Sequence, residues 1–154
     1  MVIFNHTLES TRKNTHKLTW RQLLEKVTTM NKLIMILFIT IGLINFLPVL
    51  GLISAAKITQ AYSVELASND LVILMRHRAL LFGIIGGFIL YSAFVPQYQV
   101  IAMIMAAVSM VGYLAVMGSV GGYNSSLFKV AVVDIVGIGL LVIVAILKYF
   151  ETRS

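Results

Sequence analysis

The sequence predicts an all-α integral membrane protein: a bundle of four spanning helices that follows a short N-terminal amphipathic segment. Its 154 residues are 59% hydrophobic and 12% charged, with a mean hydropathy of +0.94, whereas soluble domains carry about 25% charged residues. No Asp, Glu, Lys or Arg lies between Lys32 and Lys57, or between Arg78 and Lys129. These intervals are long enough for helices to cross a bilayer, and a soluble core could not bury so much apolar surface.

Residues 1–31 are expected to form a cytoplasmic tail that ends in an interfacial helix. Residues 1–18 lack periodicity, whereas residues 19–30 separate apolar from polar side chains, with Thr19 and Gln22 as a capping box and Trp20 as an anchor. Alternatively, this segment is a cytosolic extension of the first span. Met30 could also be a natural start, which would make the preceding residues dispensable.

The membrane domain, residues 32–150, divides into four predicted spans, at about 33–54, 78–95, 100–117 and 127–149. Pro48 should kink the second half of the first span, because proline cannot donate a helical hydrogen bond. Residues 55–70 form the longest polar connection. Asn69 or Asp70 in that connection can cap the helix that leads into the second span.

The distribution of lysine and arginine predicts the orientation of this four-span domain. Eight of these residues lie on the side that holds both termini, and four lie on the other side. Cytoplasmic segments carry the excess of Lys and Arg, so both termini should lie in the cytoplasm and the protein in the inner (plasma) membrane of the cell. The net charge of +6 is thereby accounted for without nucleic acid.

Glycines indicate how the spans pack. Gly83 and Gly87 lie four residues apart on the second span, and Gly137 lies on the fourth. Small residues let helices approach closely in lipid, so we expect the second and fourth spans to be neighbours. The alternative is that these glycines form the face of a homodimer.

Five polar residues are expected to gather in the outer half of the bundle, and they are the candidate ligand-binding residues: Asn45, Arg76, His77, Arg78 and Asp134. An ionisable residue at membrane depth costs about 2.5–3.5 kcal/mol on insertion scales, so each needs a partner or a purpose. One interpretation is a structural ion pair between Asp134 and Arg78, or Arg76. Another is that the surplus positive charge receives an anionic or polar headgroup. His77 could alternatively contact a quinone or carry a proton.

Several kinds of chemistry have no support in the sequence. Without cysteine there is no disulfide or thiolate site, and no histidine pair has metal-ligand spacing, so no metal site is expected. Phosphate-binding glycine loops, serine elbows and paired carboxylates are not found either. We therefore expect neither a catalytic residue nor a cofactor.

Three segments carry a family resemblance: Ile44–Pro48 (INFLP), Leu74–Gly83 (LMRHRALLFG) and Gly121–Asn124 (GGYN) before Asp134. From about Met30 to Phe150 the chain resembles a family of small, uncharacterised bacterial four-helix membrane proteins that are broadly DoxX-like. Such proteins sometimes carry the name phosphopantetheine adenylyltransferase. That enzyme family needs a soluble α/β fold and a His-x-Gly-His signature, and the signature is missing here. The resemblance implies the architecture and no activity.

The sequence thus favours a non-enzymatic membrane protein, either an accessory or assembly factor or a bundle that binds a lipid or quinone. Its expected partners are membrane lipids, with a quinone, an anionic headgroup, a membrane-protein partner or a second copy as candidates. The alternative function is a small membrane enzyme or redox component that acts on a hydrophobic substrate, with Arg76, His77 and Asp134 around it.

Overall fold

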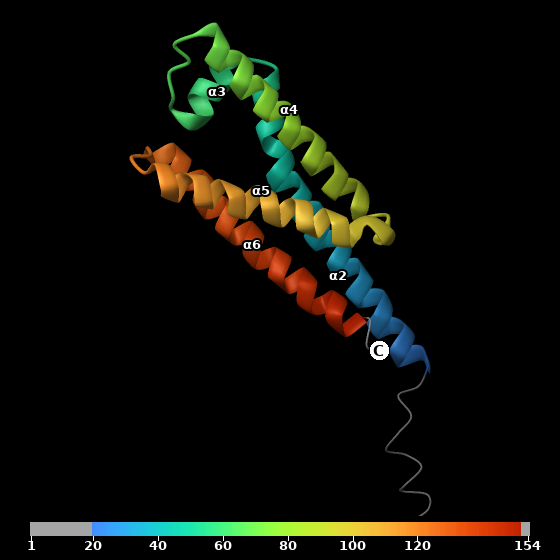
Figure 1. Ribbon diagram of the computed structural model, residues 1–154. Coiled ribbons are helices and arrows are strands. Elements are labelled where there is room, and N and C mark those ends of the chain that lie inside the picture. The colour runs from blue at the N-terminus through green and yellow to red at the C-terminus, as the bar shows by residue number, and fades with distance from the viewer. Residues whose placement is uncertain (1–19, 152–154) are drawn as a thin grey trace, which may run out of the picture. The chain divides into compact units, whose positions relative to one another are not determined.

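The structure is a computed structural model that describes the backbone of residues 20–151 and the side chains of Glu25 and of residues 27–151. The described chain consists of helices joined by short turns and loops (Figure 1). It divides into two compact units between Leu33 and Ile34. Its elements in chain order are α2 (Trp20–Phe46), η1 (Leu47–Leu52), α3 (Ala55–Tyr62), α4 (Asn69–Ser92), η2 (Pro96–Tyr98), α5 (Gln99–Val120) and α6 (Ser125–Glu151).

Four helical segments are long and apolar enough to cross a membrane: Val27–Leu52, Asn69–Ser92, Pro96–Val120 and Ser125–Glu151. Large apolar side chains remain exposed on all four, as expected of surfaces that face lipid rather than water. The prediction of an all-α, four-helix membrane protein is therefore confirmed. Each observed helix is longer than its predicted span, because its polar ends also keep helical hydrogen bonds.

The first helix is continuous from Trp20 to Phe46. Residues 20–30 are thus its first turns, as in the interpretation of this segment as an extension of the first span. No glycine or proline interrupts the chain before Gly42, so nothing in the sequence ends a helix earlier. Residues 1–19, including the predicted cap at Thr19, and the side chain of Trp20 lie outside the described part of the chain.

Pro48 ends the first α-helix, a stronger effect than the predicted kink. The α-helix stops at Phe46, and residues 47–52 continue as the 3-10 helix η1 with Pro48 in its first turn. Proline has no N–H for the carbonyl of Ile44, the group that residue 48 would contact in an α-helix. One turn earlier, the Asn45 side-chain amide donates to the Ile41 carbonyl at 3.0 Å.

The connection between η1 and α4 contains a short helix that the sequence analysis did not predict. This helix, α3, buries Ile58 and ends at Ser63, whose φ of 52° is left-handed. The predicted caps of the next helix, Asn69 and Asp70, are wrong by one or two residues. Ser68 is the cap, because its hydroxyl accepts a hydrogen bond of 3.2 Å from the N–H of Leu71.

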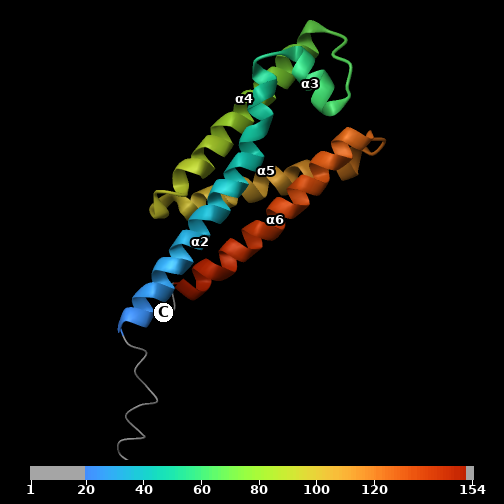
Figure 2. The ribbon, with the colours of Figure 1, turned by 180° about the vertical axis from the view of Figure 1, so that it is seen from behind.

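Glycines on α4 allow it to pack closely against residues 34–52 of the first spanning segment, beside which it runs in both views (Figures 1 and 2). A methyl group at Gly86 would lie 2.5 Å from the backbone nitrogen of Phe46, and one at Gly83 would lie 2.5 Å from Val49. At Gly87 the nearest atom would be 4.0 Å away, in the Phe46 ring. The predicted packing role is thus found at Gly83 and is much weaker at Gly87.

The fourth span packs through glycine as well, but its neighbour is α5. A methyl group at Gly137 would lie 2.5 Å from Cε of Met110 on α5. The glycines of α4 instead face α2 and η1, so the predicted contact of the second and fourth spans through these glycines is wrong. The rotation of each helix about its own axis determines which neighbouring helix its glycines contact. The spacing of the glycines alone does not reveal that rotation.

Candidate functional site

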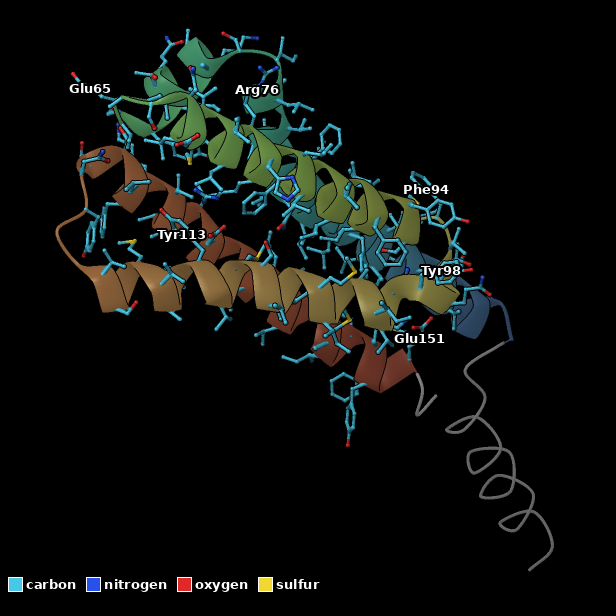
Figure 3. The ribbon with its side chains drawn as sticks, turned by 45° about the horizontal axis from the view of Figure 1, so that its top comes forward. Glu65, Arg76, Phe94, Tyr98, Tyr113 and Glu151 are labelled. Atoms are coloured by element: carbon cyan, nitrogen blue, oxygen red, sulfur yellow. The ribbon has the colours of Figure 1, made fainter. Side chains whose placement is uncertain are left out.

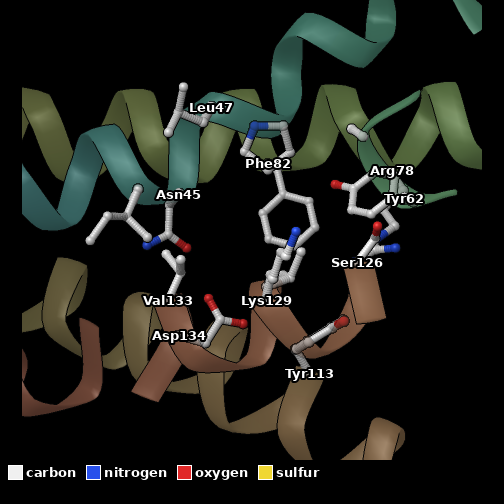
Figure 4. Close-up of a pocket in the computed structure, with 14 residues that line it drawn as sticks. Asn45, Leu47, Tyr62, Arg78, Phe82, Tyr113, Ser126, Lys129, Val133 and Asp134 are labelled. Carbon is white, nitrogen blue, oxygen red and sulfur yellow. The ribbon is translucent and has the colours of Figure 1, made fainter. Parts of the chain in front are cut away.

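A cavity of about 310 Å³ opens between α2 with η1, α3, α4, α5 and α6. Its walls are largely apolar, and polar side chains enter it from every surrounding α-helix (Figure 4). The polar residues of its lining include Asn45, Tyr62, Arg78, Tyr113, Lys129 and Asp134. Three of these six, Asn45, Arg78 and Asp134, are among the five residues that the sequence analysis grouped together.

Arg78 and Asp134 lie at matching depths. From Asn69 to Arg78 and from Ser125 to Asp134 the chain advances nine residues, which is about 14 Å along each helix axis. Both side chains are partly buried. Asn45, Arg78 and Asp134 all line this one cavity.

Aromatic rings surround the guanidinium of Arg78. Its central carbon lies 5.5 Å from the ring centre of Tyr62, 5.3 Å from that of Phe82 and 5.7 Å from that of Tyr113. Each such contact contributes about 0.5–2 kcal/mol, depending on how dry the site is. Within the described residues Arg78 has no hydrogen-bond acceptor, so its N–H groups remain available to an occupant of the cavity.

Asp134 enters the cavity from α6, and Asn45 points toward it from α2 (Figure 4). Arg78 acts on Asp134 electrostatically, but no nitrogen of Arg78 lies within the 4.0 Å of an ion pair. The expected structural ion pair between Asp134 and Arg78 is therefore not formed as a direct contact. Packing against three rings holds the guanidinium on its own side of the cavity, and neither charge has a hydrogen-bond partner among the described residues.

Arg76 and His77 do not line the cavity. Arg76 Nε donates a hydrogen bond of 2.9 Å to the carbonyl of Leu52, and Figure 3 shows this arginine beside η1. His77 is exposed on α4. Successive residues of a helix point about 100° apart, so three consecutive side chains cannot share one face. The grouping of Arg76 and His77 with the cavity residues is wrong for that reason.

Lys129, Tyr62 and Tyr113 also line the cavity, although none of them was among the predicted site residues. Lys129 replaces Arg76 as the second cation, and Figure 4 shows its amine extending toward the cavity from α6. Its position near the start of a span was the available signal. Tyr62 belongs to the unpredicted helix α3, and Tyr113 gave the pattern of an interfacial aromatic residue rather than of a ligand contact.

Hydrogen bonds fix the elements that carry the two tyrosines. The side-chain amide of Asn124 donates to the carbonyls of Tyr62 at 2.9 Å and Ser63 at 3.1 Å, and its oxygen accepts from the N–H of Leu127 at 2.9 Å. Asn124 thus caps α6 and joins it to the end of α3. The Tyr113 hydroxyl donates to the Leu127 carbonyl at 3.0 Å, so α5 is tied to the same turn.

The chemistry that this arrangement offers is recognition by charge and hydrogen bonding. Arg78 and Lys129 can donate to an anion, and Asp134 can accept from a donor. No group of three His, Cys, Asp or Glu side chains suited to a metal ion occurs in the described range, residues 20–151. The site therefore resembles a pocket for one end of an amphipathic molecule.

Comparisons of the chain with protein-family models, curated proteins and solved structures found no match. The resemblance to DoxX-like proteins stays a prediction. The function has to be inferred from the geometry and charges of the cavity.

Proposed function

We propose that this protein is a non-enzymatic membrane protein that binds the headgroup of a membrane lipid in the cavity and serves as an accessory factor. The observation that supports this function is the pair of unlike charges, Arg78 and Asp134, which face one cavity without contacting each other. Charges at membrane depth are costly unless they have partners. A ligand that pairs with them would offset this cost, and the site would favour it for that reason.

A lipid fits this cavity better than a fully polar solute does. Apolar side chains such as Leu47, Val130 and Val133 form much of the lining, next to Arg78. The guanidinium fork matches the oxygens of a phosphate, while the apolar wall suits the start of an acyl chain. The cavity lies among helices that cross the bilayer, so lipid is the solvent that reaches it.

The proposed location follows from the distribution of basic residues. Eight Lys and Arg residues on the side of the two termini, against four on the opposite side, favour termini in the cytoplasm. In this orientation α4 and α6 begin on the outer side of an inner membrane, and the cavity would receive lipid from the outer leaflet. His77, on which a redox role would depend, lies outside the cavity, which favours binding over turnover.

Native mass spectrometry of the protein, extracted gently from its own membrane, tests this function. Arg78→Gln should reduce retained lipid about 10- to 100-fold, because a charge-assisted hydrogen bond contributes about 1.5–3 kcal/mol. Arg76→Gln is the matched control: the same substitution two residues away, outside the cavity, should leave retention unchanged. Wild-type protein without lipid, or equal retention by both variants, would refute the proposal.

A further inference from the structure

The cavity carries both signs of charge, and Arg78 and Asp134 enter it from different helices, α4 and α6. The cations Arg78 and Lys129 come from α4 and from the start of α6, and the carboxylate of Asp134 lies beside Asn45 deeper along α6 and α2. One N–H of the Asn45 side-chain amide donates to the carbonyl of Ile41, and the amide oxygen, which accepts no hydrogen bond from the described residues, is available to an occupant. The Asp134 side therefore offers oxygen acceptors, and the Arg78 side offers nitrogen donors.

An occupant with only negative charge would satisfy half of this site. Its anion could pair with Arg78 and Lys129, but the carboxylate of Asp134 would then face a second anion and keep its acceptors unfilled. Arg78 cannot swing across to Asp134 without leaving three aromatic rings. A ligand that carries a cationic donor together with its anion satisfies both walls at once.

The form of that cation is also restricted. A primary ammonium has three N–H donors, enough for the carboxylate of Asp134 and the oxygen of Asn45. A quaternary ammonium has none, and it binds instead to the faces of aromatic rings. In this cavity three rings, those of Tyr62, Phe82 and Tyr113, already contact the guanidinium of Arg78.

We propose that the cavity binds a phosphoethanolamine group, with its phosphate against Arg78 and Lys129 and its primary ammonium against Asp134 and Asn45. This inference rests on the proposed function and names the ligand class of the same site. The volume of about 310 Å³ is at the lower end of small-molecule pockets, about 300–1,000 Å³, so it suits a headgroup rather than a whole lipid. The acyl chains would lie along the apolar outer faces of the helices.

The test offers the purified protein equal amounts of three lipids with the same acyl chains, phosphatidylethanolamine, phosphatidylcholine and phosphatidylglycerol, and measures retention by native mass spectrometry. Wild-type protein should retain the ethanolamine lipid at least 10-fold more than either of the others. Asp134→Asn should abolish its preference over the glycerol lipid, whereas Arg78→Gln should weaken retention of all three. Asp70→Asn, an exposed carboxylate on the first turn of α4, is the matched control and should change nothing.

The outcomes separate this inference from the proposed function. Suppose that Arg78→Gln loses lipid, but that wild-type protein shows no preference for the ethanolamine lipid or keeps its preference in Asp134→Asn. This result would overturn the inference and leave lipid binding intact. Wild-type protein that retains none of the lipids would overturn both. A parallel experiment uses free O-phosphoethanolamine as the probe. If the protein retains this soluble compound in a manner that depends on Asp134, and retains no lipid in that manner, the idea that the ligand is a lipid is overturned. Unfolding temperatures of all variants show whether each keeps its fold.

Discussion

Gly86 should be the least replaceable glycine on α4, although a methyl group at the adjacent Gly87 would meet its nearest atom only at 4.0 Å. A methyl group at Gly86 would lie 2.5 Å from the backbone nitrogen, 2.7 Å from Cα and 2.8 Å from Cβ of Phe46. None of these atoms can rotate away, because all belong to the helix backbone or its first side-chain atom. The two helices must therefore move apart if Gly86→Ala is to be accommodated.

The size of this effect follows from the distances. Ordinary contact begins at 3.4 Å, so the backbones at this point must separate by about 0.9 Å. A gap of that size forfeits about a quarter to a half of the local dispersion energy, and overpacking costs typically about 1–3 kcal/mol. We expect Gly86→Ala to lower the free energy of unfolding by about 2 kcal/mol. Gly87→Ala and Gly139→Ala should raise it by up to about 1 kcal/mol through helix propensity.

Reversible unfolding in mixed micelles of a mild detergent and dodecyl sulfate measures these differences, with helicity followed by circular dichroism. Gly139 is a second control, because a methyl group there would meet no atom within 4 Å. If Gly86→Ala proves as stable as Gly87→Ala, the close approach of α4 to Phe46 is not the native packing.

Two further substitutions test the packing of α6 against α5 and the hydrogen bonds that join α6 to α3. Gly137→Ala should cost less than Gly86→Ala, under about 1 kcal/mol, since the atoms in its way are the flexible end of Met110; an equal loss in the same unfolding assay would contradict this. Asn124→Ala removes the cap of α6 and both hydrogen bonds to the end of α3, so it should cost about 1–3 kcal/mol and speed hydrogen exchange in α3. Unchanged exchange there would show that α3 does not depend on this clamp.

The sequence predicted the spanning helices well, because length and lack of charge are properties of a segment alone. It did not predict α3, although Ala55, Ala56 and Lys57 favour helix, because a segment of eight residues is too short to be a stable helix on its own. Contacts from elsewhere in the fold support this helix: Ile58 is buried, and a methyl group at Gly51 would lie 2.9 Å from it. Information of that kind comes from the tertiary structure and is not carried by local pattern.

The candidate site was predictable in part for a similar reason. Charges beside or inside an apolar interval drew attention to Arg78 and Asp134. Arg78 lies eight residues past the expected cap at Asp70, and Asp134 lies seven residues past the expected start of the fourth span at Leu127, which predicted similar depths. Which of the three consecutive residues 76–78 faces inward depends on the rotation of α4 about its axis. A uniformly apolar helix gives little indication of that rotation, so the sequence could not separate Arg76 and His77 from Arg78.

The separation of Arg78 from Asp134 links the fold to the proposed function. Rings from α3, α4 and α5 hold the guanidinium, and Asn124 fastens the end of α3 to the start of α6. The unlike charges are thereby kept on different walls before any ligand arrives. A site that is already arranged loses less conformational freedom on binding, so more of the attraction remains available as affinity. A direct ion pair would have joined α4 to α6, but it would also have used the groups that a headgroup needs.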